Sequence, residues 1–342
     1  MQGKKILVLG GTGFISGRLV ALLNSAGATV STLTRGNVSS DVPEIQQIKG
    51  DRRNIALLQG LANQNSFDVV IDMIAYGPED SLDAITAFKG KVGQFIHCSS
   101  ISVYMISDKP TCPITEDQWQ LPEMEYDPRN PFGMDYGIQK RKCEEVLWDA
   151  HHLTNFPVTC LRPTYVGGPA DPACRDYFWI ERIRDGGPLL VPGEGAFQFQ
   201  SVYVEDVAQA FLRSIENAEA VGQAFNVVGD EHLTLNEYLK LLMKKVGQIV
   251  PLIHMDQKDF DESELSQHTA GDVFPFNTRR HAIFGNEKIR TEIGFNATPL
   301  EVWLEHLIEW YSEKYDEHST GYERRQQEIQ LAAMLGPAGD RL

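Results

Sequence analysis

Apolar residues in the first half of the chain follow two alternating spacings. Short continuous runs, each long enough for one buried strand, are separated by stretches in which apolar residues recur at helical intervals. Strands are predicted at 6–9, 29–33, 44–49, 67–74, 94–98 and 157–161, and helices at 14–25, 55–61, 81–88 and 136–149. This alternation predicts an α/β fold with a doubly wound parallel sheet covered by helices.

The pattern changes after Arg162. The stretch 167–195 is rich in Gly, Pro and aromatic residues, and its apolar spacing is irregular. Strands at 201–204 and 224–228, with a helix at 205–215, then indicate a return to the sheet. Thr234 begins a further helix with Glu237 three residues on, as in a capping box, and 299–315 is predicted as an amphipathic helix.

These changes predict two lobes and a tail. We expect residues 1–166 with about 196–230 to form the sheet domain, and 167–195 with 231–318 to form a smaller C-terminal substrate-binding lobe. The tail, 319–342, shows no pattern that indicates its purpose. This organisation predicts a substrate cleft between the lobes.

Composition and charge limit the classes of partner that the chain is expected to bind. The formal net charge of −16 at pH 7 argues against a nucleic acid backbone or an anionic membrane as the main partner. No apolar stretch approaches the length of a membrane span, and the apolar run at 6–9 lacks the features of a signal peptide. The five cysteines are odd in number and lack the close spacing of metal ligands. We therefore expect a cytoplasmic protein that binds a small molecule and has no metal site.

A glycine-rich turn follows the first predicted strand and opens the first predicted helix. Glycines let the backbone approach a pyrophosphate closely, and the N–H groups and dipole of the helix favour its negative charge. Because this turn lies inside repeated strand–helix units, it predicts a dinucleotide-binding sheet of Rossmann type. The residues expected to bind the cofactor here are Gly10, Gly11, Thr12, Gly13, Phe14 and Ile15.

The ends of the second and third strands are expected to form the adenosine pocket. Where NAD-selective enzymes usually place an acid for the ribose 2′-hydroxyl, this chain has Arg35. Arginine favours the 2′-phosphate of NADP through charge-assisted hydrogen bonds, although it could instead stack on the adenine or face solvent. Asp51 is placed either to contact the adenine edge or to cap the next helix. The predicted cofactor is NAD(P), with NADP favoured.

Tyr136 and Lys140 are four residues apart, so they share one face of a predicted helix. A phenol ordinarily has a pKa near 10, and an adjacent ammonium and an oxidised nicotinamide both lower that pKa by stabilising the phenolate. Ser100 follows the fifth strand, at the carboxyl edge of the sheet where ligands bind. These three residues predict a site for proton exchange beside a nicotinamide.

From residue 4 to about residue 315 the chain resembles the extended short-chain dehydrogenases of the NAD-dependent epimerase/dehydratase family. Five blocks in the family's order carry the resemblance: Gly10–Ile15, Ser99–Tyr104, Tyr136 with Lys140, Leu161–Tyr165 and Val202–Ala208. Together these blocks are specific for fold and cofactor, and much less specific for substrate.

The resemblance implies a role for individual residues. Ser100 matches the catalytic hydroxyl that steadies the substrate oxygen, with Ser102 as a nearby second hydroxyl that contacts substrate. Tyr136 matches the acid/base, and Lys140 its electrostatic partner and a ligand of the nicotinamide ribose. Ala75 and Pro163 match the family's cofactor contacts at the ends of later strands.

The chain also departs from the family pattern. Ser16 replaces the third glycine of the turn. Ile101 and Ser102 replace the Asp-Glu pair of the dehydratases, which disfavours acid-assisted elimination of water. The arginine that grips a nucleotide-sugar diphosphate is replaced by the segment 198–200, Gln-Phe-Gln; Arg279 and Arg280 are candidates to serve in its place.

Two enzyme functions and one binding function follow from these observations. The first is an NAD(P)-dependent epimerase or oxidoreductase that acts on a hydroxyl-bearing small molecule through a keto intermediate. The alternative enzyme is an NADPH-dependent ketone reductase or dehydrogenase with net redox turnover, which Arg35 and the missing diphosphate arginine support. The third is a non-catalytic dinucleotide-sensing or RNA-associated relative, against which the full set Ser100, Tyr136 and Lys140 argues. The oligomeric state is open, with a homodimer as one alternative.

Overall fold

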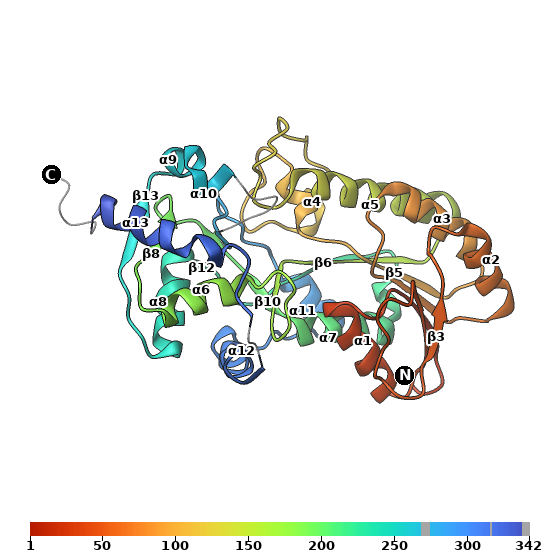
Figure 1. The fold of residues 1–342 in the computed structure, drawn as a ribbon. Coiled ribbons are helices and arrows are strands. Elements are labelled where there is room, and N and C mark those ends of the chain that lie inside the picture. Colours follow the sequence, from red (N-terminus) through yellow and green to blue (C-terminus); the bar gives the residue numbers. More distant parts are fainter. Residues whose placement is uncertain (268–273, 315–316, 337–342) are drawn as a thin grey trace. The chain divides into compact units, whose positions relative to one another are not determined.

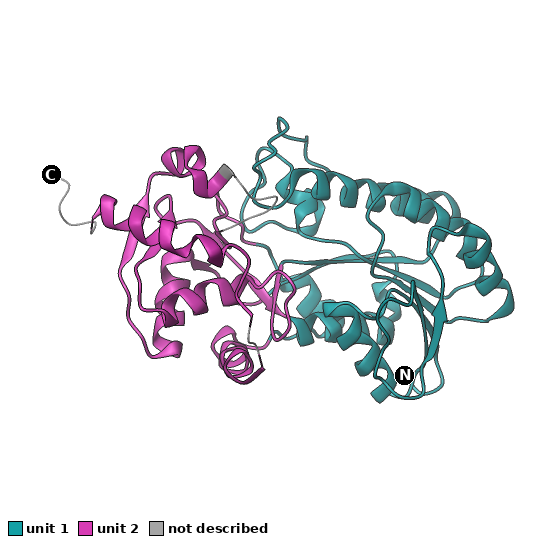
Figure 2. Cartoon of the chain, in the orientation of Figure 1, with its two compact units in different colours: residues 1–164, 204–228, 284–297 teal, residues 165–203, 229–283, 298–342 magenta. Residues whose placement is uncertain are grey.

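The computed structural model describes residues 1–267, 274–314 and 317–336, and the chain forms two compact units (Figures 1 and 2). Unit 1 comprises Met1–Thr164, Val204–Val228 and Phe284–Ala297. Unit 2 comprises Tyr165–Tyr203, Gly229–Ile283 and Thr298–Leu342. None of the helices within the described residues is both long and apolar enough to cross a bilayer.

The largest internal differences between these bounds and the predicted lobes are in two segments. Residues 196–203 belong to unit 2, where β9 (Gln198–Phe199) pairs with β12 (Leu233–Thr234). Residues 284–297 belong to unit 1, where the N–H of Gly285 bonds the carbonyl of Ile114 at 2.9 Å. Both segments are assigned to their units by pairing between residues that are far apart in the sequence. The local spacing of apolar residues does not reveal such pairing.

Unit 1 contains a sheet of seven parallel strands in the order β11-β6-β5-β4-β1-β2-β3. The strands are β1 (Lys5–Leu9), β2 (Thr29–Thr34), β3 (Gln46–Lys49), β4 (Val69–Asp72), β5 (Gln94–Cys98), β6 (Val158–Pro163) and β11 (Ala224–Val227). The order reverses between β1 and β4, and ligands of such sheets bind at this switch point, beyond the carboxyl ends of the strands. The predicted α/β fold of Rossmann type is confirmed.

Helices cover both faces of this sheet (Figure 1). The helices α1 (Phe14–Ser25) and α7 (Val204–Glu216) pack together on one face, whereas α2 (Ile55–Gln64), α3 (Pro78–Phe88) and α5 (Met134–Thr154) pack in a row on the other. Shorter helical segments of unit 1 are α4 (Ser102–Met105), η1 (Glu116–Gln120), η2 (Ala218–Ala220) and α11 (Glu287–Ile293). Leu58, Ala84 and Leu147 carry α2, α3 and α5 into one apolar core with the sheet.

A buried ion pair anchors α5 to the sheet. Glu144 of α5 and Arg162 of β6 have side chains with 0% exposure and form two hydrogen bonds with each other. Burial raises the pKa of Glu144, but the charge of Arg162 together with the hydrogen bonds from Arg162, Ser99 and Trp148 outweighs burial and holds that pKa below its usual value. Arg162 also donates to the hydroxyl of Tyr104, which in turn donates to Asn226 of β11. This network fixes the helix that carries Tyr136 and Lys140.

Within its described residues, unit 2 contains three two-stranded sheets and the helices around them. The strand pairs are β7 (Tyr165–Gly167) with β10 (Ser201–Tyr203), β8 (Leu189–Pro192) with β13 (Leu252–Met255), and β9 with β12. The helices are α6 (Arg175–Arg184), α8 (Leu235–Val246), α9 (Gln257–Glu262), α10 (Glu264–Gln267), α12 (Leu300–Lys314), η3 (Tyr322–Arg324) and α13 (Arg325–Leu335). The core contains Phe178 and Trp179 at 3% and 0% exposure, and the capping box predicted at Thr234 begins α8.

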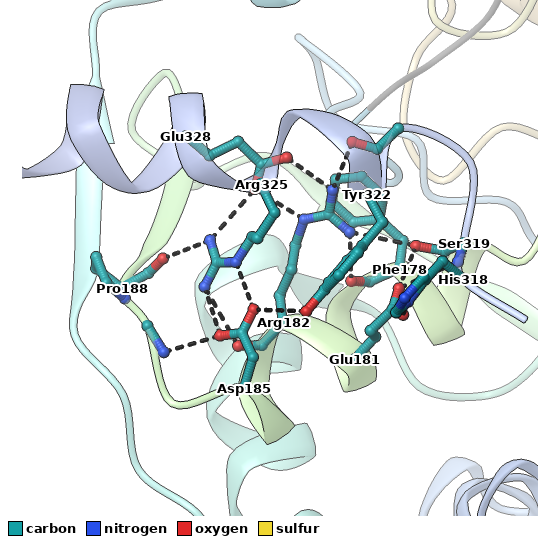
Figure 3. Close-up of polar contacts among 12 residues, drawn as sticks. Phe178, Glu181, Arg182, Asp185, Pro188, His318, Ser319, Tyr322, Arg325 and Glu328 are labelled. Carbon is teal, nitrogen blue, oxygen red and sulfur yellow. Dashed lines mark hydrogen bonds and ion pairs between the residues drawn. The ribbon is translucent and has the colours of Figure 1, made fainter. Parts of the chain in front are cut away.

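Two arginines tie the C-terminal segment to α6 (Figure 3). Arg182 pairs with Glu328 through two hydrogen bonds of 2.7 and 2.8 Å, and both side chains are 1% exposed. Its guanidinium also lies 3.4 Å from the centroid of the Phe178 ring. Arg325 pairs with Asp185 and donates to the carbonyl of Pro188 at 2.9 Å. The described part of the predicted tail, 319–336, is therefore an integral part of unit 2.

Asp176 of α6 predicts how the stability of the chain depends on pH. Its carboxyl accepts a hydrogen bond from the Tyr238 hydroxyl, and burial raises its pKa from the ordinary 3.8 to about 7. Between these values the unfolded chain gives up this proton more readily than the folded chain, so folding becomes less favourable as the pH rises.

We expect Asp176→Asn to remove this loss of folding stability at higher pH. Relative to the natural chain, its free energy of unfolding should rise by about 2 to 4 kcal/mol between pH 4 and pH 8. Urea unfolding of both chains at the two pH values measures the difference. If the two chains differed in free energy of unfolding by the same amount at pH 4 and at pH 8, the raised pKa of Asp176 would be contradicted.

Candidate active site

The glycine-rich turn joins β1 to α1, at the switch point of the sheet. Gly10 and Gly11 have φ values of +104° and +118°, which favour glycine. A Cβ on Gly11 would lie 2.8 Å from Cγ2 of Thr32, so the turn needs the close approach that only glycine gives. Ser16, which replaces the third glycine, is buried, and its hydroxyl accepts hydrogen bonds from the N–H groups of Gly11 and Gly13 at 3.2 and 2.9 Å. This serine therefore supports the turn.

The turn fits a dinucleotide pyrophosphate. The first N–H groups of a helix have no partner within the helix, and here they belong to Phe14 and Ile15 at the start of the twelve-residue α1. Gly10, Gly11 and Gly13 add no side-chain bulk to the turn, and these N–H groups provide the donors and the positive dipole end that an anion needs. Thr12 lies in the same turn and is half-buried.

The adenosine end of the predicted site lies beyond β2 and β3. Arg35 directly follows β2 and is exposed. The stem of Lys49 lies against the neighbouring Gly36, whose Cβ, if present, would be 2.9 Å from Cδ of Lys49. Asp51 accepts a hydrogen bond from the N–H of Arg53 at 2.9 Å, and the cap of α2 is Asn54. The capping alternative for Asp51 is therefore wrong, and its contact with adenine stays a prediction.

Lys140 is held by the ends of two strands. Its Nζ donates to the carbonyls of Ala75, beyond β4, and Cys98, at the end of β5, both at 2.7 Å, and the residue is 2% exposed. An ammonium has three N–H groups, so one remains for a ligand. Gly137 allows α5 to approach closely, because a Cβ there would lie 2.6 Å from the carbonyl oxygen of Ser102.

Tyr136 lies on the first turns of the same helix and is 39% exposed. The Nζ of Lys140 lies 5.9 Å from the centroid of its ring. Ser100 is half-buried just beyond β5, and its hydroxyl donates to Oγ of Ser102 at 3.2 Å. The adjacent Pro163 ends β6 and accepts a hydrogen bond from the N–H of Ile101 at 3.1 Å. The loops after β4, β5 and β6 thus meet at the N-terminal end of α5.

The residues expected to contact substrate have other partners. Ser102 is 5% exposed, and its hydroxyl donates to the carbonyl of Phe132 at 2.9 Å, so it supports the segment before α5. Arg279 lies in unit 2 and forms hydrogen bonds of 2.9 and 3.1 Å with the carboxylate of Asp261. Arg280, its neighbour, also lies in unit 2. A substrate role for these three residues stays a prediction.

Tyr76 was not predicted as part of the site. The Nζ of Lys140 lies 5.1 Å from the centroid of the Tyr76 ring, and the centroids of the Tyr76 and Tyr136 rings are 6.5 Å apart. Partial burial raises the pKa of the Tyr76 phenol above its ordinary value, and this effect outweighs the lowering by the charge of Lys140. The one sequence signal was its place directly after Ala75, which the resemblance had already marked.

Three comparisons with known proteins agree with this geometry. Residues 6–228 match the model of the NAD dependent epimerase/dehydratase family. A curated relative, the chloroplast stem-loop binding protein of 41 kDa b from Arabidopsis thaliana, is 29% identical over 307 residues, which cover 85% of this chain and 75% of that protein.

Solved structures share the fold. UDP-glucose 4-epimerase from Thermotoga maritima, solved with UDP-glucose, has a TM-score of 0.71 and 21% identity, covering 91% of this chain and 100% of that one. UDP-glucuronic acid 4-epimerase from Bacillus cereus, solved with NAD, has a TM-score of 0.69 and 21% identity, covering 93% of this chain and 99% of that one. At this level of identity the likeness extends to the fold alone.

Proposed function

Because the chain belongs to the NAD dependent epimerase/dehydratase family, we propose that it is an NAD(P)-dependent epimerase or oxidoreductase that acts on a hydroxyl-bearing small molecule, sugar-like or sugar-nucleotide-like. The observation that carries the proposal is the pair of hydrogen bonds that fixes the ammonium of Lys140. Two carbonyls hold its ammonium at 2.7 Å on the face of α5 that also bears Tyr136, which leaves one N–H for a ribose hydroxyl. This arrangement is the one that proton exchange beside a nicotinamide requires.

Each residue has a distinct part in the proposed reaction. When bound, the cofactor supplies a nicotinamide ring that accepts or returns hydride. The phenolate of Tyr136 removes the proton from the substrate hydroxyl while Ser100 holds the substrate oxygen through its own hydroxyl. Lys140 stabilises the phenolate and orients the nicotinamide ribose. The carbon that loses hydride becomes a ketone.

Epimerisation and net reduction differ in what happens next. In an epimerase the ketone presents its other face and takes back the hydride, and Tyr136 returns the proton, so no cofactor is consumed. In a reductase the hydride and the proton are transferred in one direction only, and cofactor is consumed. The segment Gln198–Gln200, which lacks a diphosphate-binding arginine, supports the reductase for substrates without a nucleotide.

Two measurements test the proposal in sequence. Mass spectrometry of small molecules released from the purified protein should detect a nicotinamide dinucleotide and identify a retained substrate or fragment. Turnover of that compound without net absorbance change at 340 nm supports epimerisation, and a steady change supports the reductase. A chain that binds neither NAD nor NADP would refute both reactions.

The preference for NADP is the part of the proposal that rests on Arg35. We expect Arg35→Ala to weaken NADP binding about tenfold, since a charge-assisted hydrogen bond to the 2′-phosphate is lost, and to leave NAD binding within about twofold. Isothermal titration with both dinucleotides measures this. Lys89→Ala removes an exposed positive charge at the C-terminal end of α3 and serves as the control. Equal effects on NADP and NAD would contradict the preference.

An RNA-associated function is the second candidate, favoured by the stem-loop binding relative at 29% identity. The net charge of −16 opposes it, because phosphate contacts dominate the affinity of proteins for RNA. A gel-shift titration with a stem-loop RNA at 50 and 200 mM salt separates the candidates. Tight binding that weakens steeply with salt would support the RNA function, and it would leave the dinucleotide test to decide whether both functions coexist.

A further inference from the structure

The turn between β4 and α3 is fixed by a buried group of three charges, which we call the Arg52 clamp: Arg52, Asp72 and Asp80. The guanidinium of Arg52 pairs with Asp72 and lies 3.0 Å from Oδ1 of Asp80. All three residues are at most 6% exposed. A buried charge group is costly to assemble, so its presence under a surface turn indicates that the conformation of the turn matters.

The clamp holds the backbone of residues 74–77 from both ends. Oδ1 of Asp72 accepts the N–H of Ile74 at 3.1 Å. Oδ2 of Asp80 accepts the N–H of Tyr76 at 2.9 Å and that of Gly77 at 3.2 Å. Ala75 lies between these anchors, and its carbonyl holds Lys140. The same restraints therefore place the ammonium and the backbone of Tyr76.

The Tyr76 side chain is large and exposed, and it projects from a backbone that the Arg52 clamp holds. It is 54% exposed, so its ring contributes little to the apolar core. Its ring lies over the ammonium of Lys140 at 5.1 Å, within the range of a cation–π contact, and is tilted 48° to the ring of Tyr136. An aromatic ring restrained in this way beside a reaction centre is suited to pack against a bound ring system.

The position of the turn along the sheet indicates which part of the cofactor it meets. The proposed adenosine contacts follow β2 and β3, and the pyrophosphate turn follows β1. The proposed contacts of the nicotinamide end follow β5 and β6, so the loop after β4 lies between the pyrophosphate and the nicotinamide. Its closest ligand group is the nicotinamide ribose that Lys140 is proposed to bind.

We propose that Tyr76 is a further cofactor-binding residue whose ring packs against the nicotinamide ring of the dinucleotide. The inference rests on the proposed function, since it assumes a nicotinamide dinucleotide at this edge of the sheet. The Arg52 clamp fixes the turn, Lys140 holds the ribose, and the Tyr76 ring covers the nicotinamide ring beside it.

The test compares ligands that differ only in the nicotinamide. Isothermal titration with NAD⁺ and ADP-ribose, and with NADP⁺ and 2′-phospho-ADP-ribose, is run on the natural chain, Tyr76→Leu and Tyr76→Phe. We expect Tyr76→Leu to weaken binding of the dinucleotides about fivefold to tenfold and to change binding of the two ADP-ribose ligands by less than about twofold. Tyr76→Phe keeps the ring and should bind all four ligands like the natural chain.

Each other outcome overturns a defined statement. Wild-type affinity of Tyr76→Leu for the dinucleotides, or equal weakening of all four ligands, overturns the contact with the nicotinamide ring. If Tyr76→Phe is as weak as Tyr76→Leu, the ring face is not the contact. If the natural chain binds ADP-ribose and both dinucleotides equally, the inference is overturned and the proposed function stands. If it binds none of them, the proposed function is overturned as well. Thermal melting of each variant confirms that it is folded.

Discussion

Tyr136→Phe is expected to lower kcat/KM by about 10²- to 10⁴-fold while changing the affinity for the dinucleotide by no more than about threefold. The substitution removes the phenol that exchanges the proton and keeps the ring against α5. Lys140 stays bonded to its two carbonyls, so the cofactor site is intact. Rates are measured with the substrate identified by mass spectrometry, and affinity by titration calorimetry.

Tyr126→Phe is the matched control for this experiment. Tyr126 is another exposed phenol, and its hydroxyl donates to Asp135 in the first turn of α5 at 2.9 Å. Removing that hydroxyl should leave kcat/KM within about twofold, because no proton is transferred there. If Tyr136→Phe retained the activity of the natural chain, Tyr136 would not be the acid/base and the mechanism would need a different proton carrier.

Arg182→Met is expected to reduce the free energy of unfolding by about 3 to 5 kcal/mol. The substitution leaves the carboxylate of Glu328, buried at 1% exposure, with only the 3.2 Å contact from Arg325 in place of its bidentate partner. It also removes the guanidinium that lies over the Phe178 ring. Urea unfolding followed by circular dichroism measures the loss.

A double variant separates the loss of the Arg182–Glu328 ion pair from the lost packing. In Arg182→Met with Glu328→Leu no lone carboxylate is left at this position, and Arg325 keeps its pair with Asp185. Buried pairs replaced by apolar residues are often neutral in stability, so the double variant should recover most of the loss. A double variant as unstable as Arg182→Met would show that packing around the guanidinium, and not the broken ion pair with Glu328, causes the loss of stability.

Much of the fold could be predicted because unit 1 is built from regular repeats. The predicted helix at 14–25 coincides with α1, and the predicted strand at 94–98 coincides with β5. Parallel strands buried on both faces give continuous apolar runs, and the helices between them are amphipathic, so period alone separates the two. Unit 2 has short strands of two to four residues, which are too brief to leave a period.

The candidate site was predictable where the spacing of residues along the sequence determines their relative positions in space. Tyr136 and Lys140 share a face because α5 is a helix, and Gly10–Gly13 turn because they follow a strand. Arg52 and Tyr76 could not be found this way, because a charged residue and an aromatic residue in loops ordinarily indicate solvent and local packing. Their roles depend on Asp80, a partner 28 residues from Arg52 that only the folded chain brings near.

The division of unit 1 into three stretches of chain has a consequence for synthesis. The edge strand β11 joins β6, and α7 packs on α1, yet both belong to the stretch 204–228, and α11 follows only at 287–293. A nascent chain that has left the ribosome as far as residue 164 exposes an unpaired strand edge and an uncovered helix. Both invite aggregation. The sheet domain therefore matures only when nearly all of the polypeptide has been translated, and a fragment cut after β6 is expected to need a chaperone to stay in solution.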